Sequence, residues 1–386
     1  MLNFNFYNPT HVVFGKDRLS ELATLIPQNS KVLITYGGGS IKKFGTFDKI
    51  TEALKGFEIF EFGGIEPNPQ LNTCIKAAEF IKENNIDFIL AVGGGSVLDA
   101  TKYISIAAKY DGDDYASLIK HGFSPVPVTE AVPFGTVLTL PATGSEMNAF
   151  SVISDVTGKY GIYSPLFFPK FSVLDPTLTY TLPKKQVANG IVDTFVHVIE
   201  QYITFPVDAK FQDRAAEGIL QTLIEIGEKT INNPEDYDTR ANFMWCATMA
   251  LSGVVGSGVP QDWSTHMIGH EFTAKFDIDH ARTLAMVLPS LLRERKDKKE
   301  AKLLQYAERV WNITEGTNDE RIEAGIQKTE AFFNTLGVAS KISDYDVKKE
   351  ELKDIISQLE SHGMTALSET GDLTLDVTER ILENAY

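Results

Sequence analysis

Two short apolar runs, each followed by the same four residues, place the strongest constraint on how this chain folds. KVLITY (31–36) and FILAV (88–92) are each followed directly by GGGS, and a helical pattern comes after each glycine cluster. Continuous apolar runs of this length are typical of strands that are buried on both faces, as in a parallel sheet. The repeated order of strand, glycine turn and helix therefore predicts an α/β fold with helices on both faces of the sheet.

The rest of the first half extends this pattern. Further strands are expected at FEIFEF (57–62), TVLTLPA (136–142) and FSVLDP (171–176), and an amphipathic helix is expected over 74–85. At the N-terminus, NFNFYNPTHVVFG predicts two strands joined by an Asn-Pro turn. Such an exposed hairpin has an edge that could pair across a two-fold axis, which favours a homodimer.

The second half has a different sequence pattern. From about residue 184, apolar residues recur at helical spacing, and no strand is expected. We therefore expect an α/β nucleotide-binding domain over residues 1–180 and an all-helical metal-binding domain over 181–386, joined at LDPTLTYTLP. The basic cluster RERKDKK (293–299) is expected at a solvent-exposed helix end.

Composition excludes several classes of protein. No apolar run approaches the roughly 18 residues that span a bilayer, and the first residues lack the pattern of an export signal. The only two cysteines, Cys74 and Cys246, are far apart, which argues against a disulfide framework and favours a cytoplasmic location. The formal net charge of −16 disfavours a nucleic-acid partner. A phosphate-bearing ligand would then be held by backbone amides and a few cations, which directs attention to the glycine turns.

The second glycine cluster, in FILAVGGGSVLDATK, leads from a buried strand into a helix. Glycines at such a turn let a diphosphate approach the backbone, and the helix N-terminus offers free N–H groups. The alternative is a tight turn with no ligand. Asp99 and Lys102 follow on the helix, where Lys102 is compatible with an ordinary surface lysine.

The first glycine cluster indicates which nicotinamide cofactor is used. A sheet that selects NAD usually presents a carboxylate beyond a strand end, to bind the adenosine ribose. Here the strand is followed by Gly37, Gly38, Gly39 and Ser40, then Ile41, Lys42 and Lys43, with no acid within reach. A hydroxyl and two cations favour the 2′-phosphate of NADP. An aspartate at Gly39 is predicted to invert that preference.

Histidines are concentrated in one part of the second half. Four of the seven lie between 197 and 280, and two pairs are spaced four apart: Asp193 with His197, and His266 with His270. Residues four apart share one face of a helix, so these pairs indicate a metal site. A zinc peptidase would carry glutamate directly after the first histidine, but Met267 stands there and Glu271 follows the second.

The segments GGGSVLDATK, TLPATGSE, NGIVDTFVHVIEQY, GVPQDWSTHMIGHEF and DHARTLAMVLP together resemble the iron-containing (group III, metal-dependent) alcohol dehydrogenases. Within that family the chain is most similar to the NADPH-dependent aldehyde reductase and butanol dehydrogenase branch. The resemblance implies a Rossmann-like α/β domain and an all-α domain, the dehydroquinate synthase-like fold, with the active site in the cleft between them. It also implies a homodimer.

The resemblance further implies the site residues. The metal ligands are then Asp193, His197, His266 and His280, with His270 as a neighbour that relays a proton. The implied cofactor positions lie along the first half of the chain: Gly38, Gly39, Ser40, Gly94, Gly95, Ser96, Asp99, Thr139, Thr143, Ser145, Asn148, Lys159 and Leu178.

The activity that follows is hydride transfer between NADPH and an aldehyde, with a divalent metal as Lewis acid. The ligand set suits Zn²⁺, Fe²⁺, Mn²⁺ or Ni²⁺ equally. Rival interpretations are an NAD-dependent polyol dehydrogenase or a dehydroquinate-type cyclase of the same fold, a zinc hydrolase, and a binding module with structural zinc. The cyclase would need several basic residues near the metal, and 260–285 offers only Lys275 and Arg282.

Overall fold

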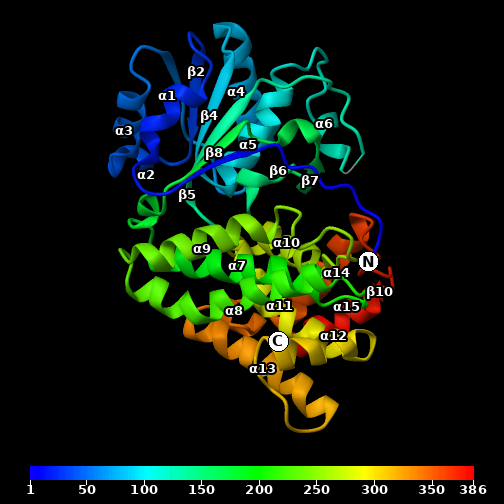
Figure 1. Ribbon diagram of the computed structural model, residues 1–386. Coiled ribbons are helices and arrows are strands. Elements are labelled where there is room, and N and C mark those ends of the chain that lie inside the picture. Colours follow the sequence, from blue (N-terminus) through cyan, green and yellow to red (C-terminus); the bar gives the residue numbers. More distant parts are fainter. Residues whose placement is uncertain (123) are drawn as a thin grey trace. The chain divides into compact units, whose positions relative to one another are not determined.

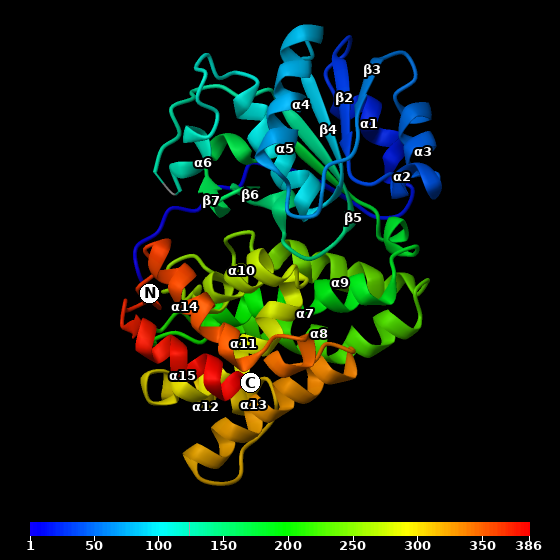
Figure 2. The same ribbon diagram turned by 180° about the vertical axis from the view of Figure 1, so that it is seen from behind.

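A computed structural model describes residues 1–122 and 124–386. Its internal contacts divide the chain into two compact units. The α/β unit comprises Tyr7–Leu182 and Pro234–Met244, and the helical unit comprises Met1–Phe6, Pro183–Asn233 and Trp245–Tyr386. Figures 1 and 2 show the same ribbon from opposite sides.

The α/β unit is built on a sheet of six strands in the order β1-β8-β5-β4-β2-β3, with every neighbouring pair parallel. The predicted parallel sheet is therefore confirmed. The strands are β1 (His11–Phe14), β2 (Lys31–Tyr36), β3 (Glu58–Phe62), β4 (Phe88–Gly94), β5 (Phe134–Leu140) and β8 (Phe171–Leu174).

Both faces of this sheet are covered by helices, as the sequence predicts. Successive side chains of β2 point to opposite faces, so Leu33 joins one apolar cluster while Val32 and Ile34 join the other. The first cluster is completed by α4 (Leu71–Asn84) and α5 (Gly95–Ala107). The second is completed by α1 (Leu22–Leu25), α2 (Ser40–Lys43) and α3 (Thr46–Ala53). The short α6 (Ser117–Lys120) follows α5.

The predicted N-terminal hairpin is wrong. Residues 1–10 form no strand, and β1 lies at the sheet edge, where His11 pairs in parallel register with Phe171 of β8. A parallel partner from 160 residues further along the chain leaves no nearby strand for a hairpin to form. The hairpin in this unit is instead β6 (Phe150–Asp155) with β7 (Gly158–Tyr163), which the sequence analysis did not anticipate.

The helical unit packs around α7, whose residues from Gly190 to Tyr202 are all buried. α11 contacts α7, α10, α13 and α15, and therefore lies at the centre of this unit. Two short strands, β9 (Ala366–Leu367) and β10 (Leu373–Thr374), contradict the expectation of no strand after residue 184. The helices of the second half are α7 (Lys184–Tyr202), α8 (Lys210–Asn232), α9 (Tyr237–Ala250), α10 (Ser264–Phe276), α11 (His280–Glu294), α12 (Lys296–Arg309), α13 (Asn318–Thr335), α14 (Leu352–Ser361) and α15 (Leu375–Ala385).

Among the described residues, no helix has both the length and the apolar character to cross a membrane.

Candidate functional site

Asp193 and His197 lie one turn apart on α7, and both are buried, with 3% and 5% of their surface exposed. The apolar residues on either side, Val192 and Val196, are buried too. Helical spacing thus places a carboxylate and an imidazole side by side in an apolar interior. Burying a charge there is costly unless another group compensates it.

Two further imidazoles reach the same carboxylate from α10 and α11. Asp193 Oδ1 lies 3.8 Å from His197 Nδ1, 4.0 Å from His266 Nε2 and 3.7 Å from His280 Nε2. Asp193, His266 and His280 each offer a ligand atom within 4.8 Å of the others. The structure therefore brings four residues together that the sequence separates by as many as 87 positions.

The chemistry of this group fits the divalent metal that the sequence resemblance implies. Asp193 Oδ1 and His197 Nδ1 are buried and have no hydrogen-bond partner in the described part of the chain. Burial lowers the pKa of His197 although Asp193 opposes the shift, so the ring is held in the neutral form that binds metals. A cation among these atoms would satisfy both orphaned groups. Three imidazoles and one carboxylate are ligands that suit several divalent transition metals.

His270 lies one turn after His266 and is half-buried. Its ring centroid is 4.9 Å from that of His280 and 6.3 Å from that of His266. Trp263, the N-cap residue of α10, packs its ring 5.4 Å from the His266 ring. His270 thus borders the imidazole group.

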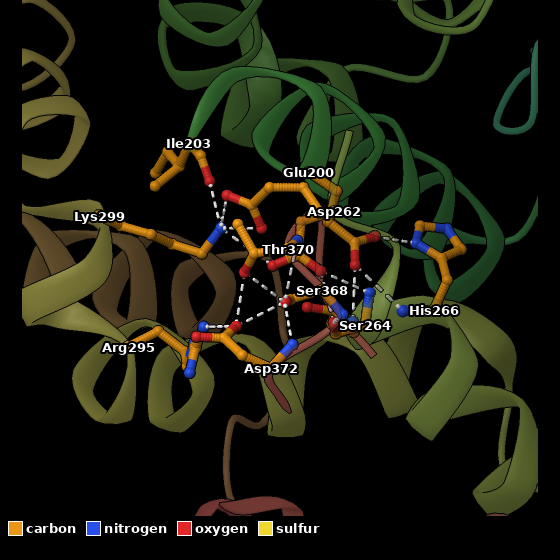
Figure 3. A network of polar contacts seen from close by, with 12 residues as sticks. Glu200, Ile203, Asp262, Ser264, His266, Arg295, Lys299, Ser368, Thr370 and Asp372 are labelled. Atoms are coloured by element: carbon orange, nitrogen blue, oxygen red, sulfur yellow. Dashed lines mark hydrogen bonds and ion pairs between the residues drawn. The ribbon is translucent and has the colours of Figure 1, made fainter. Parts of the chain in front are cut away.

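The sequence analysis missed a buried glutamate behind His266. Glu200 on α7 contacts His266 Nδ1 through Oε2 (Figure 3). The other ring nitrogen, Nε2, is the one near Asp193. A signal was present, because Glu200 follows His197 by three positions and so shares its helix face. Ligating histidines usually donate their second ring N–H to a carboxylate or carbonyl, and Glu200 fits that pattern.

The basic cluster at 293–299 lies at the end of α11 and the beginning of α12, and the expected solvent exposure holds for Lys298 but not for the whole cluster. Arg295 and Lys299 are only 6% and 2% exposed. Lys299 lies between Asp262 and Glu369, and Arg295 contacts Asp372. The long side chains turn inward because carboxylates from distant segments compensate them, which no local pattern reveals.

In the α/β unit, the glycine turns lie at the carboxyl ends of neighbouring strands. β4 lies between β2 and β5, with Val92 opposite Tyr36 and Gly94 opposite Leu140. A Cβ at Gly94 would lie 2.9 Å from the Leu140 Cβ, and one at Gly95 would lie 2.6 Å from Thr143 Oγ1. Close packing therefore requires glycine here, and no side chain among the described residues caps the N-terminus of α5. The free helix N–H groups fit a diphosphate.

Asp99 links α5 to the loop that precedes β6. It accepts hydrogen bonds from Ser145 Oγ (2.5 Å) and Val152 N (2.9 Å), and burial raises the pKa of its carboxyl. Lys102 is fully buried rather than on the helix surface, and it donates to Asn148 Oδ1 (2.9 Å) and Phe150 O (2.7 Å). These contacts fix the loop through residues 145–150 on α5.

The first glycine turn is open. No atom lies within 4 Å of a Cβ built on Gly38 or Gly39, and Gly39 has a φ of +94°. Lys42 is not available as the sequence analysis supposed, because it contacts Glu61 of β3 and lies over the Tyr36 ring. An acid is therefore near this turn, supplied by the neighbouring strand, but it is paired with a lysine.

The other cofactor positions that the resemblance implies are spread over the same unit. Gly38, Gly39 and Ser40 lie at the end of β2, Gly94, Gly95 and Ser96 at the end of β4, and Thr139 at the end of β5. Asn148 Nδ2 donates to Gly144 O (2.9 Å) and contacts Thr143 O (3.3 Å), so it orders its own loop. Lys159 on β7 donates to Asn68 Oδ1 (2.9 Å), and Leu178 packs on the apolar cluster that contains β2 residues Val32 and Ile34.

Comparison with known proteins decides the family. Residues 9–176 match the model of the iron-containing alcohol dehydrogenases, and residues 187–385 match the C-terminal model of the same family. The chain is 55% identical to the NADPH-dependent aldehyde reductase YqhD of Escherichia coli, with 100% of each chain covered. This chain belongs to the iron-containing alcohol dehydrogenase family.

Other members of the family agree. A probable NADH-dependent butanol dehydrogenase of Bacillus subtilis is 44% identical over 94% of this chain and 95% of its own. The crystal structure of Escherichia coli YqhD covers 100% of this chain and 99% of its own, with a TM-score of 0.97. An NADH-dependent butanol dehydrogenase structure from Thermotoga maritima gives 0.93 at 34% identity, with 100% and 99% covered. The parallel α/β sheet with a mainly helical second half is therefore the fold of this family.

Proposed function

We propose that this protein is a metal-dependent NADP(H) alcohol dehydrogenase that reduces small aldehydes and oxidises primary alcohols in reverse. The observation that carries the proposal is the convergence of three imidazole nitrogens, from His197, His266 and His280, on Asp193 Oδ1 within 4.0 Å. The 55% identity to an NADPH-dependent aldehyde reductase over the whole chain supports this choice of cofactor and substrate.

The residues that would hold the divalent metal are Asp193, His197, His266 and His280. A bound metal supplies Lewis-acid polarisation of the substrate oxygen, and NADPH supplies the hydride. Asp193 would contribute the negative charge, and the three imidazoles would contribute nitrogen ligands. His270, beside His280, is proposed to move a proton to or from the substrate oxygen.

The residues that would hold NADP(H) lie on the α/β unit. Gly94, Gly95, Ser96 and Asp99 at the start of α5 would bind the diphosphate through backbone N–H groups. Gly38, Gly39 and Ser40 would leave room for the 2′-phosphate. Thr139, Thr143, Ser145, Asn148, Lys159 and Leu178 would line the path toward the nicotinamide. Residues 1–180 would then form the nucleotide-binding domain, and 181–386 the metal-binding domain.

We also propose a cytoplasmic homodimer. Cys74 and Cys246 are both buried and not disulfide-bonded, as suits a reducing compartment.

The test is one preparation assayed for metal content, NADPH fluorescence and NADPH oxidation over aldehydes of increasing length. Asp193→Ala should lose bound metal and aldehyde reduction together while still binding NADPH. Full activity in metal-free wild-type protein would contradict the proposal. Equal or better turnover with NADH and a polyol would favour an NAD-dependent polyol dehydrogenase.

A further inference from the structure

We propose that Glu200 is a positioning residue of the metal site, which holds His266 so that its Nε2 is directed toward Asp193. We also propose that the buried ion cluster Asp262–Lys299–Glu369 anchors Glu200 in that role. The inference deepens the proposed function and rests on it, because it concerns affinity for the same divalent metal.

Glu200 contacts both the ring and the backbone of His266. Its Oε2 contacts His266 Nδ1, and its Oε1 accepts hydrogen bonds from the backbone N of His266 (3.3 Å) and of Thr265 (2.6 Å). The side chain is only 4% exposed. The two ring nitrogens lie on opposite sides of an imidazole, so fixing Nδ1 on Glu200 turns Nε2 toward Asp193 Oδ1, 4.0 Å away. One carboxylate therefore sets both the place and the rotation of this ring.

Asp262 connects this contact to the ion cluster (Figure 3). Its backbone N donates to the carbonyl of Glu200 (2.8 Å), while its Oδ1 accepts from the backbone N of Ser264 (2.9 Å). Its Oδ2 lies 2.9 Å from Lys299 Nζ. Asp262 thus ties the C-terminal turns of α7 to the beginning of α10, the two segments whose spacing decides whether Glu200 reaches His266.

Lys299 closes the cluster from α12. Its ammonium donates to the carbonyl of Ile203 (2.8 Å), just past the end of α7, and to both oxygens of Glu369 (2.8 and 2.9 Å). Its side chain is 2% exposed. Four segments that are distant in the sequence therefore meet at one buried cation.

Three buried carboxyl groups in this region lie near a single buried ammonium. Asp262 and Glu369 share the single ammonium of Lys299, and Glu200 adds a third buried carboxylate on the side of the ring opposite Asp193. A carboxylate on Nδ1 fixes the tautomer and makes Nε2 a better electron donor to a metal. Loss of such partners in metalloproteins commonly lowers metal affinity by about 10- to 100-fold.

The chain contains a matched control. Glu271 on α10 pairs with His362 Nδ1 at 2.8 Å, and its side chain is likewise only 5% exposed. In this second glutamate–histidine pair the glutamate is buried, and the histidine is not a candidate metal ligand. If Glu200 only helps packing, then Glu200→Gln and Glu271→Gln should behave alike.

The experiment compares wild type, Glu200→Gln and Glu271→Gln for Zn²⁺ affinity by competition with a chromophoric chelator, and for the visible spectrum of the Co²⁺-loaded protein. Circular dichroism and NADPH fluorescence report on folding. We expect Glu200→Gln to bind Zn²⁺ about 10- to 100-fold more weakly with an altered Co²⁺ spectrum, while Glu271→Gln stays within twofold of wild type and NADPH binding is unchanged.

Zn²⁺ affinity and Co²⁺ spectrum at the wild-type level in folded Glu200→Gln would overturn the inference, as would equal losses in both variants. Should Glu200→Gln not fold, Glu200→Asp keeps a carboxylate but shortens it by one methylene, and carries the same expectation and the same overturning result. Failure of the wild type itself to bind Zn²⁺ or Co²⁺ would instead overturn the proposed function.

Discussion

His270 is the residue whose role differs most from that of its neighbours. It follows His266 by one turn, yet its ring borders His280 rather than joining the group around Asp193. At the scale of single residues, we propose different roles for two histidines of the same helix, His266 as a metal ligand and His270 as a proton carrier. The distinction can be tested, because loss of a metal ligand removes the metal, whereas loss of a proton carrier lowers turnover and leaves the metal bound.

We expect His270→Asn to keep its metal and lower turnover by about 10²-fold, because a positioned proton carrier contributes roughly that much. The pH dependence of kcat should also change. The matched control is His362→Asn, which removes a histidine that contacts the buried Glu271 of α10. Metal analysis and pH–rate profiles are the measurements. Loss of metal in His270→Asn would mean that this ring is a ligand.

Gly38 is the position at which cofactor preference is best reversed. The sequence analysis favoured an aspartate at Gly39, but the φ of +94° there makes any side chain strained. Gly38 is open and lacks that strain. Gly38→Asp should place a carboxylate near the ribose and weaken NADPH through repulsion of its 2′-phosphate. Loss of one charge-assisted hydrogen bond, about 1.5–3 kcal/mol, corresponds to about 10- to 100-fold.

The measurement is kcat/KM for NADPH and NADH with one aldehyde in wild type, Gly38→Asp and Gly39→Asp. We expect Gly39→Asp to lose stability by about 1–3 kcal/mol from backbone strain. If the ratio of kcat/KM for NADPH to kcat/KM for NADH is the same in wild type and Gly38→Asp, the first glycine turn does not contact the 2′-phosphate.

At the scale of elements, a buried lysine holds α5 to the loop that precedes β6. Burial lowers the pKa of Lys102 to about 8 from an ordinary value of 10.5, although Asp99 and Glu146 oppose the shift. Between these two pH values the unfolded chain binds more protons at Lys102 than the folded chain does. The free energy of unfolding therefore rises with pH across this window.

Urea unfolding at pH 8 and pH 9.5 tests this sign. Relative to Lys102→Met, which cannot titrate, wild type should gain about 1–2 kcal/mol of stability over that interval. The lost bonds to Asn148 and Phe150 lower the stability of the variant by an amount independent of pH. Identical pH slopes for the two proteins would show that Lys102 titrates normally in the folded state.

At the scale of the whole molecule, the homodimer needs a different argument from the one that the sequence suggested. The N-terminal hairpin does not form, but Phe4, Phe6 and Tyr7 are 48%, 53% and 70% exposed. Three exposed aromatic side chains within four residues are unusual on a monomer surface and favour a contact surface. The N-terminal stretch therefore still favours association, through side chains instead of a strand edge.

Light scattering at micromolar concentration should give the mass of a dimer for wild type. The double variant Phe4→Ser, Phe6→Ser should shift the equilibrium toward monomer, because it removes apolar area from the contact. Val156→Ser removes an isolated, fully exposed apolar side chain at the β6–β7 turn and should leave the dimer intact. A monomeric mass for wild type would contradict the prediction.

Local sequence patterns predicted much of the fold. The buried runs at 31–36 and 88–92 predicted parallel strands because strands buried on both faces must be apolar throughout, and both strands are confirmed. The long amphipathic helices were likewise visible from their spacing. The N-terminal hairpin failed because β1 pairs with β8, and pairing between segments so distant leaves no local signal. The β6–β7 hairpin was missed because its sequence carries no strong alternation.

The candidate site, too, was predicted from the sequence only in part. The sequence alone determined which residue types lie one helical turn apart, so it predicted Asp193 with His197 and drew attention to His266 and His280. Only the tertiary structure decided that three imidazole nitrogens lie within 4.0 Å of one oxygen. It also decided that Glu200 is buried against His266 and that Lys299 is buried against Asp262 and Glu369. The physical reason is that desolvation and charge compensation depend on segments brought together by packing, and a local pattern contains no information about a partner 60 to 100 residues away.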